Sequence, residues 1–121
     1  MRKRRSRLSL FGLILSGLHT LVVLSMLLII ASSWYSGSGE VAMAWYGIYC
    51  LDFPSSWLAF ETEDLLDAIT GDRLGPTAVN VYVPALMFGF WGGIQYYIIG
   101  AGVAALARFL FGSSRGHKNH I

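Results

Sequence analysis

The stretch VYVPALMFGFWGGIQYYIIGAGVAALA, residues 81 to 107, decides the fold class because it is long, apolar and free of charged side chains. A helix rises about 1.5 Å per residue, and about 20 apolar residues are enough to cross the hydrocarbon core of a bilayer. The stretch LSLFGLILSGLHTLVVLSMLLIIA, residues 8 to 31, has the same character. The sequence therefore predicts an all-α integral membrane protein with transmembrane helices over residues 8–33 and 81–110, joined as a two-span helical hairpin.

Charged residues are sorted along the 121-residue chain, in which 55% of the residues are hydrophobic and only 13% are charged. Except for Arg73, the lysines and arginines lie close to the two ends, whereas every acidic residue lies in the middle. Basic segments are retained on the cytoplasmic side of a membrane. We therefore expect residues 1–7 and 111–121 to be cytoplasmic and residues 34–80 to lie outside. The expected location is a cell membrane, typically a bacterial inner membrane.

The basic N-terminus MRKRRSR, residues 1–7, has two other interpretations. Such a run is also typical of a nucleic-acid-binding tail, but the apolar stretch begins immediately after it, so we expect no nucleic acid as a partner. It also resembles the start of a secretory signal, whose apolar region usually has about 7–15 residues. The apolar run here is much longer, which favours an uncleaved membrane anchor.

The connection between the two spans begins with an aromatic segment, residues 41–54. A third crossing here would bury Asp52 at a high cost and would place the C-terminal basic residues outside. Because amphipathic aromatic rings prefer the headgroup region, we expect this segment to lie at the interface or to re-enter the membrane. The interfacial aromatic residues that we expect are Trp45, Tyr46, Tyr49 and, just beyond the segment, Trp57.

Residues 55–70, SSWLAFETEDLLDAIT, have the pattern of a short amphipathic helix with a serine N-cap and Gly71 as its stop. Apolar side chains share one half of the helical projection and most of the acidic ones share the other, although Glu61 falls on the apolar side. We expect this outer helix to lie on the membrane surface or on a partner. The acidic run is Glu61, Glu63, Asp64 and Asp67. These carboxylates are spaced for a divalent cation, but a solvated helix face is the simpler interpretation.

Small residues recur on one face of each predicted span. On a helical projection, four small residues of the second span fall within about 60° of one another. A similar stripe, at intervals of four residues, runs along the first span. Small residues let helix backbones approach closely in lipid, so we expect these two faces to pack together. The helix-packing residues are Gly12, Ser16 and Thr20 in the first span and Gly89, Gly93, Gly100 and Ala104 in the second.

Three polar or aromatic residues lie near the predicted midplane of the bilayer: His19, Gln95 and Tyr96. Antiparallel packing puts His19 at the depth of Gln95, but Gln95 points more than about 100° away from the glycine stripe. Tyr96 is therefore the residue that we expect to meet His19. An unsatisfied amide in hydrocarbon is costly, so Gln95 needs another partner. A second copy, another subunit and the aromatic segment are all candidates, and we expect a contact outside the hairpin.

His19 is the strongest candidate for a chemical role, because an intramembrane imidazole can ligate haem iron or chlorophyll magnesium. One histidine gives one axial ligand, and only a homodimer would provide the second. An interhelical hydrogen bond is the simpler interpretation, and a proton relay lacks a carboxylate partner in either span. The sequence contains no recognisable nucleophile–base pair, phosphate loop or zinc ligand set. We therefore expect neither an enzyme, nor a catalytic residue, nor a metal site, nor a bound cofactor.

These features favour a small accessory or interaction subunit of a larger membrane assembly, or a homo-oligomer. Its partners would be the lipid bilayer and either another membrane protein or a second copy of the chain. A holin-like or channel-forming oligomer is the main alternative, against which stand the long acidic loop and the lack of a polar face along either span. Haem or chlorophyll binding through His19 is the third hypothesis.

Overall fold

The computed structural model describes residues 9–37 and 41–112, and these residues are almost entirely helical. No strand occurs in these two ranges, so the prediction of an all-α protein is confirmed. The basic N-terminus and most of the C-terminal tail lie outside the described residues. The elements are α1 (Leu10–Tyr35), α2 (Val41–Leu51), α3 (Ser55–Thr70), the 3₁₀ turn η1 (Gly71–Leu74), α4 (Gly75–Thr77), the π-helical turn η2 (Ala78–Tyr82) and α5 (Val83–Gly112).

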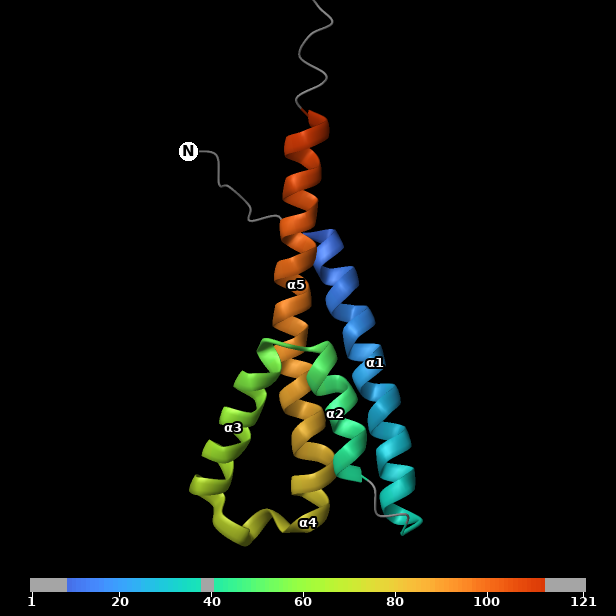
Figure 1. The fold of residues 1–121 in the computed structure, drawn as a ribbon, viewed down its shortest axis with the longest axis vertical. Helices are drawn as coiled ribbons and strands as arrows, with labels where there is room; N and C mark the ends of the chain where they lie inside the picture. Colours follow the sequence, from blue (N-terminus) through green and yellow to red (C-terminus); the bar gives the residue numbers. More distant parts are fainter. Residues whose placement is uncertain (1–8, 38–40, 113–121) are drawn as a thin grey trace, which may run out of the picture.

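The two long helices, α1 and α5, lie side by side and run in opposite directions (Figure 1). α1 begins where the hydroxyl of Ser9 accepts a hydrogen bond from the Gly12 amide at 3.2 Å. α5 continues beyond the start of α1 at its C-terminal end. By length and composition, α1 and the helical run that contains α5 are each long enough and apolar enough to cross a membrane.

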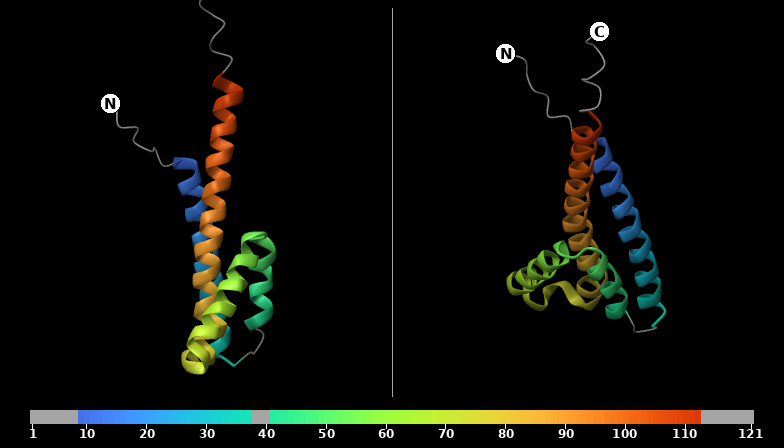
Figure 2. Two further views of the ribbon diagram at one scale, coloured as in Figure 1. Left: turned by 90° about the vertical axis from the view of Figure 1, so that its left-hand side faces the viewer. Right: turned by 45° about the horizontal axis from the view of Figure 1, so that its top comes forward.

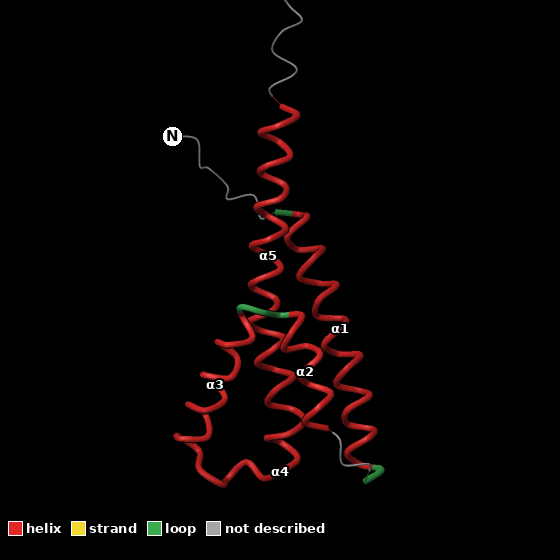
Figure 3. The backbone as a smooth tube through the Cα atoms, viewed as in Figure 1, coloured by secondary structure: helices red, strands yellow, loops and turns green. Residues whose placement is uncertain are grey.

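The two shorter helices, α2 and α3, form a V beside the first half of α5 (Figure 2). Their junction, residues 52–56, is called the tip below. Figure 3 shows the loop of the tip beside the middle of α5, while the other ends of α2 and α3 lie at the same end of the molecule as the short elements η1, α4 and η2. The chain therefore runs from the end of α1 back to the middle of the molecule and out again before α5 begins.

The bounds of α3 agree with the predicted outer helix, but its N-terminal cap differs. Pro54 occupies the cap position without a side-chain hydrogen bond, and the Ser55 hydroxyl instead donates to the Asp52 carbonyl at 2.8 Å. The Phe53–Pro54 peptide bond is cis. At the other end, Gly71 has φ 56°, a backbone conformation that favours glycine. The prediction that Gly71 ends this helix is therefore confirmed.

The apolar core lies where α2, α3 and η2 meet the two long helices. Phe88 of α5 is at its centre, with ring centroids 5.9 Å from both Trp45 and Phe60. Trp45 is buried, and its indole N–H donates to the Asn80 carbonyl at 2.9 Å. We expected Trp45 at the membrane interface, but α2 turns it toward α5. Of the other predicted interfacial residues, Tyr46 and Trp57 are exposed and Tyr49 is half-buried.

The predicted packing faces of α1 and α5 meet at their glycines. A Cβ atom added to Gly100 would lie 2.6 Å from the Gly12 Cα, so the two backbones touch. Gly93 faces Ser16, whose hydroxyl lies 3.4 Å from the position of an added Cβ. Gly89 faces Val23. Gly12, Ser16, Gly89, Gly93 and Gly100 therefore lie in the contact between α1 and α5, whose closest approach is near the start of α1.

One residue of the predicted packing faces, Thr20, lies elsewhere. Thr20 is exposed, and its hydroxyl donates to the Ser16 carbonyl one turn earlier at 2.9 Å. Thr20 therefore belongs to the outer surface of α1, because the packing face of α1 passes through His19 and Val23 instead. Ala104 is half-buried, one turn beyond Gly100.

Candidate functional site

The main polar cluster of the described residues lies where the tip meets α1 and α5. The imidazole Nε2 of His19 is 3.3 Å from Oδ2 of Asp52, and both side chains are almost completely buried, at 2% and 0% exposure. The same Nε2 is 3.2 Å from the Phe88 carbonyl oxygen of α5. One nitrogen of α1 thus faces an acceptor from the tip and an acceptor from α5.

Tyr96 joins this cluster from one side. Its ring stacks on the His19 imidazole, with centroids 4.7 Å apart and an interplanar angle of 19°. Its hydroxyl donates to the Leu51 carbonyl at 3.1 Å, at the end of α2. The predicted meeting of His19 and Tyr96 is confirmed, and Tyr96 also connects α5 to the residue that precedes the tip.

Gln95 finds its partners inside the chain. Its Oε1 accepts from the Ser55 amide at 2.9 Å, and its Nε2 donates to the Phe53 carbonyl at 3.4 Å. Of the three candidate partners for this amide, the structure therefore gives the aromatic segment, through Phe53, together with the first residue of α3. The tip, which belongs to the predicted aromatic and amphipathic segments, occupies the face of α5 that the helical projection left without a partner.

Gly92 makes room for the His19–Asp52 pair. A Cβ atom at Gly92 would lie 2.6 Å from Asp52 Oδ2 and still closer to His19 Nε2. Any other residue would force the pair away from α5, because such distances are far below van der Waals contact. Gly92 is not among the residues of the predicted packing face of the second span, and no pattern in the sequence indicates that it contacts a polar pair.

Several buried oxygens at the tip lack ordinary hydrogen bonds. Within the part of the chain that the structure describes, Asp52 Oδ1, Asp52 Oδ2 and Ser56 Oγ have no hydrogen-bond partner, and the 3.3 Å contact with His19 is an ion-pair distance. Buried polar atoms of this kind are rare in proteins and need a physical explanation. Sequence reasoning missed Asp52 as the partner of His19, because it treated burial of this carboxylate as an isolated cost.

Two surface hollows lie away from the His19–Asp52 pair. The first is an apolar groove of about 580 Å³ between α3 and the middle of α5, which borders the tip. Its most prominent walls are Trp57, Trp91 and Ile98, and it is called the α3–α5 groove below. Trp91 is fixed there by a 3.1 Å hydrogen bond from its indole N–H to the Thr62 hydroxyl.

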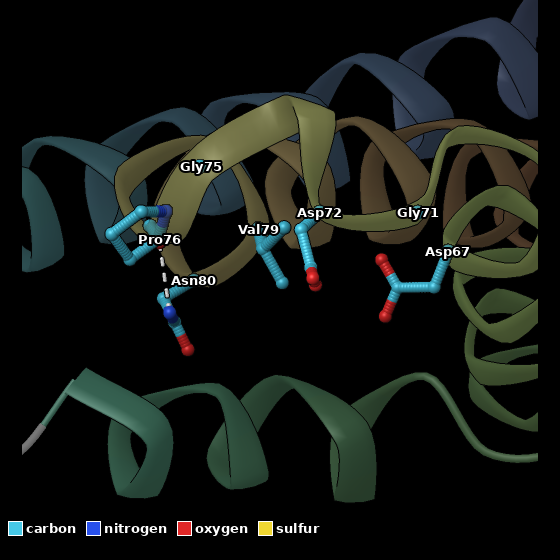
Figure 4. Close-up of a pocket in the computed structure, with 7 residues that line it drawn as sticks. All are labelled: Asp67, Gly71, Asp72, Gly75, Pro76, Val79 and Asn80. Atoms are coloured by element: carbon cyan, nitrogen blue, oxygen red, sulfur yellow. Dashed lines mark hydrogen bonds between the residues drawn. The ribbon is translucent and has the colours of Figure 1, made fainter.

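The second hollow is a pocket of about 400 Å³ beside η1, α4 and η2. Figure 4 shows the side chains of Asp67 and Asp72 pointing into the same space, while the Asn80 amide donates to the Pro76 carbonyl at 2.8 Å. Both aspartates are exposed. Over residues 9–37 and 41–112, no three His, Cys, Asp or Glu side chains are grouped closely enough to hold a metal ion.

Comparison with known proteins gives no match: no family model, no curated protein and no solved structure matches the chain.

Proposed function

We propose that the chain is a two-span integral membrane protein in which α2 and α3 re-enter the bilayer from the outer side and reach its centre. The observation that carries this proposal is the distribution of polarity. The buried polar and charged side chains among the described residues are those of His19, Asp52, Ser55 and Ser56, all near the tip. Large apolar side chains cover the outside of both long helices. A soluble protein of this size rarely exposes so much apolar surface.

The exposed apolar side chains lie on all the elements that would contact lipid. Leu28 of α1 is 73% exposed, Leu86 of α5 is 67% exposed and Ile69 of α3 is 71% exposed. In water these faces would have to be covered, whereas in a bilayer they meet acyl chains directly. Every backbone group at hydrocarbon depth needs a partner within the protein, and the non-helical loop of the tip meets this need through Gln95 and Tyr96.

The orientation that we propose has both termini in the cytoplasm. Apart from Glu40 and Asp52, the acidic residues of the sequence lie in α3 and in the turn that follows, whereas the basic residues, apart from Arg73, lie close to the two ends of the sequence. Positive charge is retained on the cytoplasmic side. The connection between α1 and α5 is therefore outside, and α2 and α3 enter from there.

Reporter fusions test this topology. A reporter inserted at Gly39 and one inserted at Asp72 should both report the outer compartment, because α2 and α3 return to the side from which they enter. A reporter after Ile121 should report the cytoplasm. Opposite signals at Gly39 and Asp72 would mean that the segment between them crosses the membrane, and the re-entrant proposal would then be wrong.

For the biochemical role, we propose an interaction subunit of a larger membrane assembly or a homo-oligomer. The supporting observation is the α3–α5 groove, which is lined mainly by apolar and aromatic side chains at the depth where the tip ends. A concave apolar surface beside a helix fits the side chains of a second helix. In lipid, helix association depends on such close packing, because there is no hydrophobic drive to bring the helices together.

The matched variants Ile98→Trp and Leu21→Trp test this role. Ile98 lines the groove and is 62% exposed, whereas Leu21 is 60% exposed on the outer face of α1. Indole in the groove should abolish the cross-linked or co-purified complex recovered from native membranes, while Leu21→Trp should retain it. Equal recovery with both variants, or a monomer as the sole species in native membranes, would contradict the proposal.

The two rival functions have less geometric support. A channel-forming oligomer would need a polar face exposed along a membrane-spanning helix, but the buried polar side chains of the described residues converge on one internal cluster. A haem or chlorophyll ligand would need a free imidazole nitrogen directed outward. The Nε2 atom of His19 instead faces Asp52 and the Phe88 carbonyl, under the ring of Tyr96.

A further inference from the structure

We propose that His19 and Asp52 form a proton-binding site, and that the proton held there keeps the tip against α1 and α5. The pair is the point where α1, the tip and α5 meet, since Asp52 belongs to the tip and the Phe88 carbonyl to α5. The proposal goes beyond the interaction role described above and does not depend on any partner.

The positions of the neighbouring atoms define which hydrogen is fixed. His19 Nε2 lies 3.2 Å from a carbonyl oxygen and 3.3 Å from a carboxylate oxygen. A carbonyl can only accept a hydrogen bond, so Nε2 carries a hydrogen that it donates to the Phe88 carbonyl oxygen, while Asp52 Oδ2 lies beside it at ion-pair distance. This hydrogen is present in both the neutral and the cationic imidazole, and it is not the one that dissociates.

The dissociable proton therefore occupies one of two other positions. It lies either on His19 Nδ1, which gives an imidazolium beside a carboxylate, or on an Asp52 oxygen, which gives a neutral pair. Both arrangements have no net charge. Transfer of this proton to hydroxide or water leaves a neutral imidazole beside a carboxylate and thus one uncompensated negative charge at a site with almost no solvent exposure. Breaking the compensation of a buried pair in this way is strongly unfavourable.

The groups packed around the pair offer no other compensating charge among the described residues. On α5 the neighbours are the Phe88 carbonyl, Gly92 and Tyr96, and Tyr96 already donates its hydroxyl hydrogen to the Leu51 carbonyl. The adjacent tip residues, Ser55 and Ser56, are not ionisable. The acidic side chains of α3 begin at Glu61, beyond the tip, and would add negative charge. Loss of the proton is therefore relieved by hydration of Asp52, which requires movement of the tip.

The tip is attached in a way that permits such movement. Apart from the pair, its polar contacts with the long helices are the two hydrogen bonds of Gln95, with the Tyr96–Leu51 bond immediately before it. A cavity of about 200 Å³ next to His19 and Tyr96, lined otherwise by Leu15, Leu18, Val22 and Leu51, leaves room beside the pair. The proton-bound state thus has a closed tip, and the proton-free state has a displaced one.

Spin-label distance measurements test the proposal on the full chain in lipid nanodiscs. In a Cys50→Ser background, labels at Phe53→Cys and Leu106→Cys report the tip relative to α5, and labels at Leu21→Cys and Leu106→Cys report α1 relative to α5. All three labelled positions are exposed. The tip pair should give one narrow distance at neutral pH and should lose it at alkaline pH, whereas the α1–α5 pair should stay unchanged.

Asp52→Asn supplies the decisive control, because it keeps the shape of the side chain and removes the titrating carboxylate. With this substitution the tip distance should stay narrow from neutral to alkaline pH. The proposal is overturned if the tip distance of the unsubstituted site does not change with pH, or if Asp52→Asn shows the same change. Either result leaves the interaction role untouched, because that role is tested by complex recovery.

A second measurement covers the case in which Asp52→Asn fails to fold. With His117→Gln and His120→Gln, His19 is the only histidine, and the ¹⁵N resonances of its imidazole can be followed against pH. These resonances should change over the same pH interval in which the tip distance loses its narrow distribution, because both changes report loss of the shared proton. Resonances that stay constant while the tip moves would show that His19 and Asp52 do not share that proton, and would overturn the proposal.

Discussion

Two glycines of α5, Gly100 and Gly92, lie eight residues apart and serve opposite kinds of contact. Gly100 meets the backbone of α1 at Gly12, in a part of the interface where the packing is tight and apolar. Gly92 meets the side chains of His19 and Asp52, in a part where the packing encloses polar groups. The same small residue thus brings two helices together in one region and makes room for a buried ionisable pair in the other.

The difference matters because the two regions respond to different perturbations. Dispersion contacts between backbones depend on distance and shape but not on pH. The energy of a buried ionisable pair depends on protonation and on the presence of both partners. We therefore expect substitutions near the tip to have charge-dependent effects, and substitutions near Gly100 to have effects that depend on volume alone.

The largest effect should come from His19→Leu, which leaves Asp52 buried without its partner. Removing one member of a buried pair typically costs about 3–5 kcal/mol. The free energy of unfolding, measured by reversible denaturation in detergent at pH 8, should fall by that amount. Thr20→Leu is the matched control, because the neighbouring Thr20 is exposed on α1. A loss no larger than that of Thr20→Leu would show that the pair contributes nothing to the fold.

Gly92→Ala should have the next largest effect, because even a methyl group overlaps His19 Nε2 and Asp52 Oδ2. Overpacking typically lowers the free energy of unfolding by about 1–3 kcal/mol. Because Gly92→Ala also separates His19 from Asp52, its loss should lie near the upper end of this range. Gly93→Ala, where the added Cβ would be 3.4 Å from the Ser16 hydroxyl, should be tolerated much better. Unfolding in detergent compares the two, and similar losses would remove the distinction between these adjacent positions.

Gly100→Ala should cost about 1–3 kcal/mol as well, here by pushing α1 and α5 apart at Gly12. The methyl group would lie 2.6 Å from the Gly12 Cα, and a backbone cannot move aside as a side chain can. The loss should be the same at pH 6 and pH 8. Gly102→Ala is the control, because an added Cβ meets nothing within 4 Å there among the described residues. If the loss of unfolding free energy for Gly100→Ala depended on pH, the packing at Gly100 would not be independent of the ionisable pair, and the contrast between the two regions would be wrong.

Gln95→Leu should have the smallest effect of the series. Polar side-chain hydrogen bonds between membrane helices contribute about 0.6–1.7 kcal/mol, and Gln95 holds the tip through two of them. Protease digestion of the reconstituted protein should become faster near residues 52–56, while the species recovered by cross-linking should keep its size. An unchanged digestion pattern together with loss of the larger species would restore an intermolecular role for this amide.

The sequence predicted the long helices and part of their contact for clear physical reasons. Length and hydropathy define an apolar helix, and helical periodicity brings Gly12 to Gly100 and His19 to Tyr96. The periodicity failed at Thr20, because the α1 stripe was drawn at strict intervals of four and the real contact passes through His19 and Val23.

The polar site was less predictable, because its members come from segments without a shared periodicity. The partner of His19 is Asp52, which lies outside both long helices, and no helical projection connects the two. Each polar group was judged by the cost of burying it alone. On that basis Asp52 belonged in water, and the sequence did not decide among the three candidate partners of Gln95. Matching the unsatisfied groups to one another would have given the sequence signal for the tip.

The most direct test of the His19–Asp52 pair is a double-mutant cycle with His19→Leu and Asp52→Asn, measured as free energies of unfolding in detergent at pH 8. With Asp52 present, His19→Leu should cost about 3–5 kcal/mol, because a buried carboxylate is left alone. With Asp52→Asn already in place, the same change should cost about 1 kcal/mol, roughly the net value of a neutral hydrogen bond. The difference between these costs is the coupling energy of the pair. Equal costs of His19→Leu in the two backgrounds would contradict the account, because His19 and Asp52 would then act independently.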